Sequence, residues 1–139
     1  MKDFKVRFNK GINIMWLHYV IIGIGGALGA VARVALGRIL PIAAFGMPLQ
    51  IFFINLIGCF AFGLLTEVLT LYWTASFNIR SFLIPGFLSA FTTFSAFALE
   101  SNLLIKERMY LIAIIYMILN FVLNISAFFG GMKLIKAIS

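Results

Sequence analysis

A small group of hydroxyl side chains lies between aromatic rings inside a strongly hydrophobic stretch. Residues 91–97 read Phe-Thr-Thr-Phe-Ser-Ala-Phe, and they follow Pro85 and Gly86 and precede Glu100. Polar groups at membrane depth are costly, so they usually face a protein interior or a water-filled path. Hydroxyls can donate hydrogen bonds to an anion, and the positive edge of an aromatic ring can contact an anion without a formal charge. The stretch therefore favours permeation over a chemical reaction.

Two other hydrophobic segments carry side-chain amides. Asn55 stands in an otherwise apolar run, and Tyr116, Asn120 and Asn124 recur at intervals of four residues, which places them on one helix face. Asn55 either makes an interhelical hydrogen bond, typically worth ~1 kcal/mol, or donates an N–H to a passing anion. The aligned residues form either a hydrogen-bonded packing seam or the wall of a polar track. The sequence leaves both pairs of interpretations open.

A break in the helix is expected within the first stretch. Thr92 and Thr93 are adjacent β-branched residues shortly after Ser89, and such residues weaken a helix locally. Carbonyl groups freed at membrane depth are tolerated only where they are buried or line a cavity, and they also make cation sites. Beyond the break, Phe94 and Phe97 are three residues apart and share a helix face, which the glutamate three positions later continues.

Composition assigns the chain to the integral membrane proteins. It has 139 residues, of which 63% are hydrophobic and 11% charged, whereas a soluble domain is about 25% charged. This length holds roughly four spans of ~20 residues with short loops. We therefore expect an all-α membrane protein with a single four-helix domain at residues 15–139, preceded by a basic tail at residues 1–14. The spans are expected at about residues 16–36, 49–72, 81–104 and 110–132.

The remaining chemistry-bearing residues argue against an enzyme. The sequence shows no nucleophile–base pair, no phosphate-binding loop and no cluster of Cys and His. Cys59 is the single cysteine, and the single histidine, His18, suits the membrane interface better than a metal site. Arg33, late in the first span, either reaches the lipid head groups or draws anions into a vestibule. Permeation or assembly remains.

The charge distribution predicts an orientation. The net charge is +7, and the Lys and Arg residues gather at span ends, beside anionic head groups. With four spans, both termini and the middle loop share one side, which carries seven of these residues against four on the other. The first side carries Lys2, Lys5, Arg7, Lys10, Arg80, Lys133 and Lys136, and the other carries Arg33, Arg38, Lys106 and Arg108. The positive-inside rule then favours cytoplasmic termini. Without the tail the count is three against four, which is no bias.

Three motifs follow one another along the chain. Residues 25–33 resemble the pattern Gly-Gly-x-x-Gly-Ala-x-x-Arg, and residues 55–63 resemble the pattern Asn-x-x-Gly-x-Phe-x-x-Gly. Residues 86–97 resemble the pattern Gly-Phe-x-Gly-Gly-x-Thr-Thr-Phe-Ser-Thr-Phe. In this order, the three motifs resemble those of the first, second and third spans of the Fluc (CrcB) fluoride channels, and the resemblance covers nearly the whole chain from Trp16 onward.

The resemblance implies a broken third helix and an antiparallel, dual-topology dimer with two fluoride pores. It implies passive export of toxic fluoride from the cytoplasm across the cell inner (plasma) membrane. By similarity, the residues of the fluoride pore would be Asn55, Phe94, Ser95, Phe97, Glu100, Tyr116, Asn120 and Asn124. Arg33 would lie near a vestibule. A structural sodium ion at the dimer centre would be held by backbone carbonyls around Ser89 and Thr92.

The chain departs from the family pattern at three places. Ser89-Ala90 replaces Gly-Gly, which leaves carbonyls for sodium but is expected to stiffen the break. Ala96 replaces a Thr and removes one hydroxyl near the pore. The basic tail biases the orientation. Together these departures raise an alternative to the preferred homodimer, in which the chain is a non-conducting or partner-dependent subunit of a heterodimeric fluoride channel.

Two other classes of function compete with a channel. A small dual-topology drug exporter would carry an acidic residue deep in its first span, whereas this span has none and Arg33 has the opposite charge. A structural or assembly subunit without transport of its own is the second. Fluoride flux through the purified protein in liposomes separates both from a channel.

Overall fold

The structure, a computed structural model, describes residues 2–40 and 43–139, and of residues 2–14 it describes only the backbone. Four segments are long and apolar enough to cross a membrane, which confirms the predicted all-α membrane protein with four spans. They are Met15–Ile39, Gln50–Leu71, Phe77–Lys106 and Tyr110–Ala137. Three of them extend beyond the predicted bounds, because polar and charged end residues such as Lys133 and Lys136 still adopt helical geometry.

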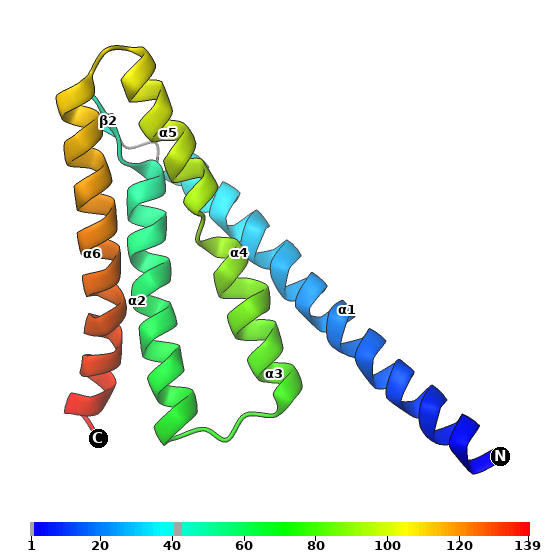
Figure 1. Cartoon of the computed structure of the whole chain (residues 1–139). Helices are drawn as coiled ribbons and strands as arrows, with labels where there is room; N and C mark the ends of the chain where they lie inside the picture. Colours follow the sequence, from blue (N-terminus) through cyan, green and yellow to red (C-terminus); the bar gives the residue numbers. More distant parts are fainter. Residues whose placement is uncertain (1, 41–42) are drawn as a thin grey trace.

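Three of the spans are single helices. They are α1 (Lys2–Ile39), α2 (Gln50–Leu71) and α6 (Tyr110–Ala137). The backbone of residues 2–14, which the sequence sets apart as a basic tail, continues α1 in one direction, so that the helix projects past its neighbours (Figure 1). The charged side chains of this tail lie outside the described part of the chain.

The third span is built from short helical pieces. They are α3 (Phe77–Ser81), the π-helix η1 (Phe82–Leu88), α4 (Ser89–Phe91) and α5 (Phe94–Lys106). Pro85 lies inside η1, and it has no N–H to continue a regular ladder. In this wider turn, the Ser89 hydroxyl donates to the Ile84 carbonyl five residues back, at 3.0 Å. Thr92 and Thr93 have extended backbone angles and separate α4 from α5.

The third span changes its partner along its length. α2 packs along α6, and α1 packs along η1 and α4 (Figure 1). α5 follows the extended residues and packs on α6 instead. The extended residues therefore mark the point at which the chain passes from one helix pair to the other.

Glycines let the backbones of α2 and α6 approach closely. A Cβ added at Gly63 would overlap the carbonyl of Phe128, and one added at Gly131 would overlap the carbonyl of Phe60. Small residues serve this purpose in membrane helices, where close van der Waals contact contributes much of the attraction between helices.

Both termini and the α2–α3 connection lie at one end of the molecule, and the α5–α6 turn lies at the other (Figure 1). At the second end, β1 (Ala43–Ala44) pairs with β2 (Met47–Pro48) in a short hairpin. At the first end, Glu67 is 5% exposed and its carboxylate lies 3.7 Å from the Lys136 ammonium. This first end is the one that the charge count assigns to the cytoplasm.

Candidate functional site

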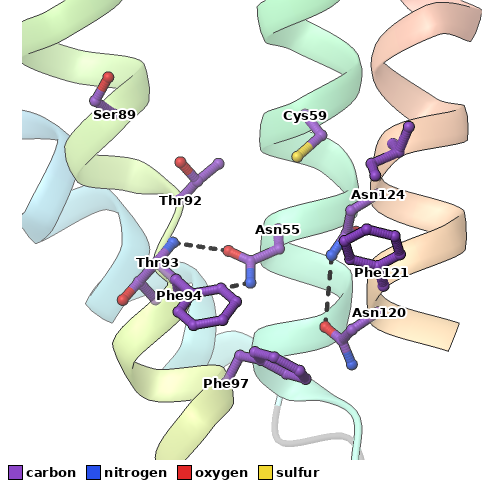
Figure 2. A pocket seen from close by; sticks show the side chains of 11 residues that line it. Asn55, Cys59, Ser89, Thr92, Thr93, Phe94, Phe97, Asn120, Phe121 and Asn124 are labelled. Carbon is purple, nitrogen blue, oxygen red and sulfur yellow. Dashed lines mark hydrogen bonds between the residues drawn. The ribbon is translucent and has the colours of Figure 1, made fainter. Parts of the chain in front are cut away.

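A pocket of about 400 Å³ opens between α2, the junction of α4 and α5, and α6 (Figure 2). Its walls include several residues that the sequence singles out, namely Asn55, Ser89, Thr92, Phe94, Phe97, Asn120 and Asn124. Its other lining residues are Cys59, Thr93, Phe121 and Ile125. The fold thus collects polar and aromatic groups from three spans around one space.

Asn55, which is 7% exposed, binds the backbone of Thr93 in both directions (Figure 2). Its Oδ1 accepts from the Thr93 N–H at 2.8 Å, and its Nδ2 donates to the Thr93 carbonyl at 3.0 Å. An extended residue in a membrane has no helical partner for these two groups, and each would cost several kcal/mol if left unpaired. The interhelical hydrogen bond considered for Asn55 is therefore present, and it supports the backbone at the junction.

The carbonyls at the end of α4 lack helical partners. In an uninterrupted helix the Thr93 N–H would bind the Ser89 carbonyl, but here it donates to Asn55. The Thr92 hydroxyl donates one turn back, to the Leu88 carbonyl at 3.0 Å, so it does not satisfy the later carbonyls. Freed carbonyls at a broken membrane helix are typical sodium ligands. The donor chemistry around Ser89 and Thr92 fits the sodium ion that the resemblance implies.

The two phenylalanines open α5. Thr93 caps this helix, because its hydroxyl accepts from the Ala96 N–H at 3.4 Å. The ring centroids of Phe94 and Phe97 are 5.3 Å apart and their planes meet at 61°, in an edge-to-face contact. Phe94 is 77% exposed, whereas Phe97 is half-buried. One ring therefore stands at the open side of the pocket and the other is packed inside it.

Behind Phe97, a chain of hydrogen bonds follows α6. Tyr116 is fully buried, its ring centroid lies 5.7 Å from that of Phe97, and its hydroxyl donates to the Glu100 carboxylate. Asn120 Nδ2 donates to the Tyr116 carbonyl at 3.0 Å, and Asn124 Nδ2 donates to Asn120 Oδ1 at 3.5 Å. The aligned polar residues are thus linked to one another, and the two asparagines also line the pocket.

Four predicted site residues do not line the pocket. Two of them, Tyr116 and Glu100, lie behind Phe97 as described above, and the other two are Ser95 and Arg33. Ser95 is exposed at the start of α5, and its hydroxyl oxygen lies 3.0 Å from that of Thr93. Arg33 lies on α1, which packs on η1 and α4, and its Nε is buried without a hydrogen-bond partner in the described part of the chain. The structure does not bring Arg33 to the pocket.

Four residues of the lining were not predicted from the sequence as site residues: Cys59, Thr93, Phe121 and Ile125. Thr93 was noted only as part of the expected helix break. Cys59 stands one helical turn beyond Asn55, so its position could have been found from that interval. Phe121 and Ile125 are themselves four apart and could have been found in the same way. The pairing of Thr93 with Asn55 has no such signal, because it joins residues 38 positions apart.

The lining has a consistent chemistry. The side chains that form the pocket carry amides, hydroxyls, a thiol and rings, and all of them are neutral. A small anion in this space would meet N–H donors and ring edges without a strong fixed charge. Weak contacts of this kind let an ion bind and leave, as conduction requires.

The sequence matches a known protein family and several of its named members. Residues 20–132 match the family described as CrcB-like protein, Camphor Resistance (CrcB). A protein of Desulforapulum autotrophicum named fluoride-specific ion channel FluC is 35% identical over 117 residues, covering 84% of this chain and 94% of its own length. A protein of the same name from Rhizobium meliloti is 36% identical and covers 86% of this chain and 97% of its own length. A third, from Chlorobium phaeobacteroides, is 39% identical over 64% of this chain and 69% of its own length.

Proposed function

The chain belongs to the CrcB-like family, a family of ion channels and not of enzymes, and we propose that it is a fluoride channel. The observation that carries this proposal is the neutral pocket in which two edge-to-face phenylalanines meet side-chain amides. The choice of fluoride as the ion comes from the names of the relatives. The four apolar helices indicate a multi-pass membrane protein.

In the proposed path, fluoride passes along the open side of the pocket. The ring edges of Phe94 and Phe97 and the amides of Asn120 and Asn124 provide the contacts. Asn55, Ser95, Tyr116 and Glu100 border the path. Arg33 acts from α1 by drawing anions towards a vestibule.

The proposed assembly is a dimer of two copies in opposite orientations. Support comes from the open pocket, since Phe94 is 77% exposed and Phe121 is 69% exposed on the same side. A sodium ion at the dimer centre, held by the carbonyls of Ser89 and Thr92, would be structural and would offset their partial charges. The proposed role is passive export of fluoride from the cytoplasm across the inner (plasma) membrane. Pairing with a different sister subunit is the alternative, supported by the charge of the tail.

Replacing either pocket phenylalanine by isoleucine tests the ring-edge contact. Phe94→Ile and Phe97→Ile keep an apolar side chain but remove the positive edge, so fluoride efflux from liposomes should fall to that of empty liposomes. Phe129→Ile, on a ring of α6 that is 55% exposed, should leave efflux unchanged. Size-exclusion chromatography checks that each variant keeps its oligomeric state. Normal efflux through both pocket variants would refute the role of the rings.

A further inference from the structure

One glycine of α2 faces the extended residues of the third span. Gly58 is buried and stands three residues after Asn55, on the same side of α2. A Cβ added to it would overlap the Cγ2 methyl of Thr92 and would lie 3.0 Å from Cδ1 of the Phe91 ring. The helix therefore touches the junction at two neighbouring positions: Gly58 contacts Thr92, and Asn55 binds Thr93.

The methyl group of Thr92 has little freedom to move away. Thr92 is β-branched, so its χ1 angle is stiff, and its hydroxyl donates to the Leu88 carbonyl at 3.0 Å. Rotation about χ1 of Thr92 would move the methyl away from α2, but it would also move the hydroxyl and break this hydrogen bond. A larger residue at position 58 would instead push the extended segment away from α2.

The hydrogen bonds of Asn55 depend on this close approach. They measure 2.8 Å and 3.0 Å, and both end on backbone atoms of Thr93. A displacement of about 1 Å would stretch both beyond the range of a hydrogen bond. Thr93 caps α5 and is followed directly by Phe94, so a shift of Thr93 shifts the first turn of α5 and both rings.

We propose that Gly58 is a positioning residue of the permeation path: its missing side chain seats Thr92 on α2, so that Asn55 can hold Thr93 and thereby fix Phe94 and Phe97. The inference rests on the proposed channel function. It also assigns Asn55 a role through the backbone of Thr93, in addition to its place beside the path.

Gly58→Ala tests the proposal, because it adds one methyl group and removes no polar contact. We expect fluoride efflux from liposomes to fall by about tenfold or more, which corresponds to a barrier higher by ~1.4 kcal/mol. The fluoride-to-chloride ratio should fall as well. Loss of folded protein would lower both fluxes in proportion, whereas displaced rings change the ratio. Gly130→Ala is the matched control, because a Cβ there meets nothing within 4 Å.

A second change tests the mechanism directly. Thr92→Ser removes the methyl that an alanine at position 58 would meet and keeps the hydroxyl that binds Leu88. The double variant Gly58→Ala/Thr92→Ser should therefore recover much of the efflux and of the ratio, and it should recover folding if the single variant does not fold.

The outcomes separate this inference from the function on which it rests. If the wild-type protein releases fluoride and the Gly58→Ala variant releases it at the same rate and with the same fluoride-to-chloride ratio, the proposed role of Gly58 is wrong, while the proposed channel function is not affected. A defect that Thr92→Ser does not relieve overturns the seating of Thr92 on α2. Absence of efflux from the wild-type protein counts against the channel itself.

Discussion

At the scale of single residues, most polar groups of the pocket already have protein partners. Asn55 binds both backbone groups of Thr93, and the hydroxyls of Ser89 and Thr92 bind carbonyls of their own span. Asn124 is different, because its Oδ1 is buried without a partner in the described part of the chain. That oxygen is an acceptor, so it offers no contact to an anion. Each asparagine amide donates one hydrogen bond to the protein and keeps a second N–H. These N–H groups and the ring edges are the contacts left for an anion, and contacts of this kind are weak.

Tyr116→Phe should destabilise the protein while keeping the ring that packs on Phe97. The hydroxyl donates to the Glu100 carboxylate, so its removal takes away a partner of a half-buried acid at a cost of about 1–3 kcal/mol. Thermal unfolding in detergent should show a lower midpoint. Tyr110→Phe, on a residue that is 58% exposed, should leave the midpoint unchanged. Equal midpoints for both variants would contradict a stabilising role for the Tyr116 hydroxyl.

The sequence predicted which residue types would gather, but not how they would pair. Hydroxyls, amides and rings in a hydrophobic chain are visible from composition and spacing. The partner of Asn55 is not, because the interval between Asn55 and Thr93 follows no helical period and their contact depends on the approach of two spans. The resemblance implied a place near a vestibule for Arg33, and the structure shows this residue on α1, apart from the pocket.

At the scale of elements, the third span connects two helix pairs. Its first part packs on α1 and its last part packs on α6, with the extended Thr92 and Thr93 between them. A straight helix could not follow both partners. The junction therefore serves packing as well as the pocket, and both depend on the close fit of α2 against its neighbours.

Neighbouring glycines on α6 should respond in opposite ways to alanine. Gly131→Ala would place a methyl on the carbonyl of Phe60, an overpacking that costs about 1–3 kcal/mol, so the unfolding midpoint should fall. Gly130→Ala meets nothing within 4 Å, and it should raise the midpoint slightly, since alanine favours a helix by up to ~1 kcal/mol over glycine. A similar midpoint for the two variants would show that the α2–α6 approach is not tight.

The number of spans could be predicted from hydropathy. The ends of the spans and the departures from regular α-helix within the third span were harder to predict. The residues beyond each apolar run, such as Lys133 and Lys136, continue the helix although they do not belong to the hydrophobic core. Pro85 signals an irregular helix, but the sequence does not show that the irregularity takes the form of a π-helix over Phe82–Leu88.

At the scale of the whole molecule, the positive-inside rule predicts that the charge at one end sets the orientation. The tail contributes four of the seven Lys and Arg residues on the side of the termini. Its helical backbone continues α1 beyond the span that begins at Met15. The charge of the tail is evident from the sequence. Its helical backbone was not predicted, because only the apolar part of α1 has the hydropathy of a membrane-spanning helix.

Neutralising the tail should change how the chain inserts. In the proposed homodimer, a tag at the C-terminus of the full chain should appear on both sides of the membrane, with an excess on the cytoplasmic side that is due to the charges of the tail. Replacing Lys2, Lys5, Arg7 and Lys10 by Gln should remove this excess, and a chain that starts at Met15 should lose it as well. The charge variant keeps the length of the tail and so separates charge from length.

The same tag also distinguishes the two assemblies. A full chain found on one side only would favour a partner of fixed opposite orientation, and a chain found on both sides would favour the homodimer. An unchanged distribution after neutralisation would contradict a role of the tail in orientation.

The most direct test of the whole account is ion efflux from liposomes that contain the purified wild-type protein. With fluoride and chloride inside, electrodes for the two ions follow their release. A fluoride channel should release fluoride rapidly and little chloride. Two results would contradict the proposed function. One is a folded protein that releases fluoride no faster than empty liposomes do, and the other is chloride release as fast as fluoride release.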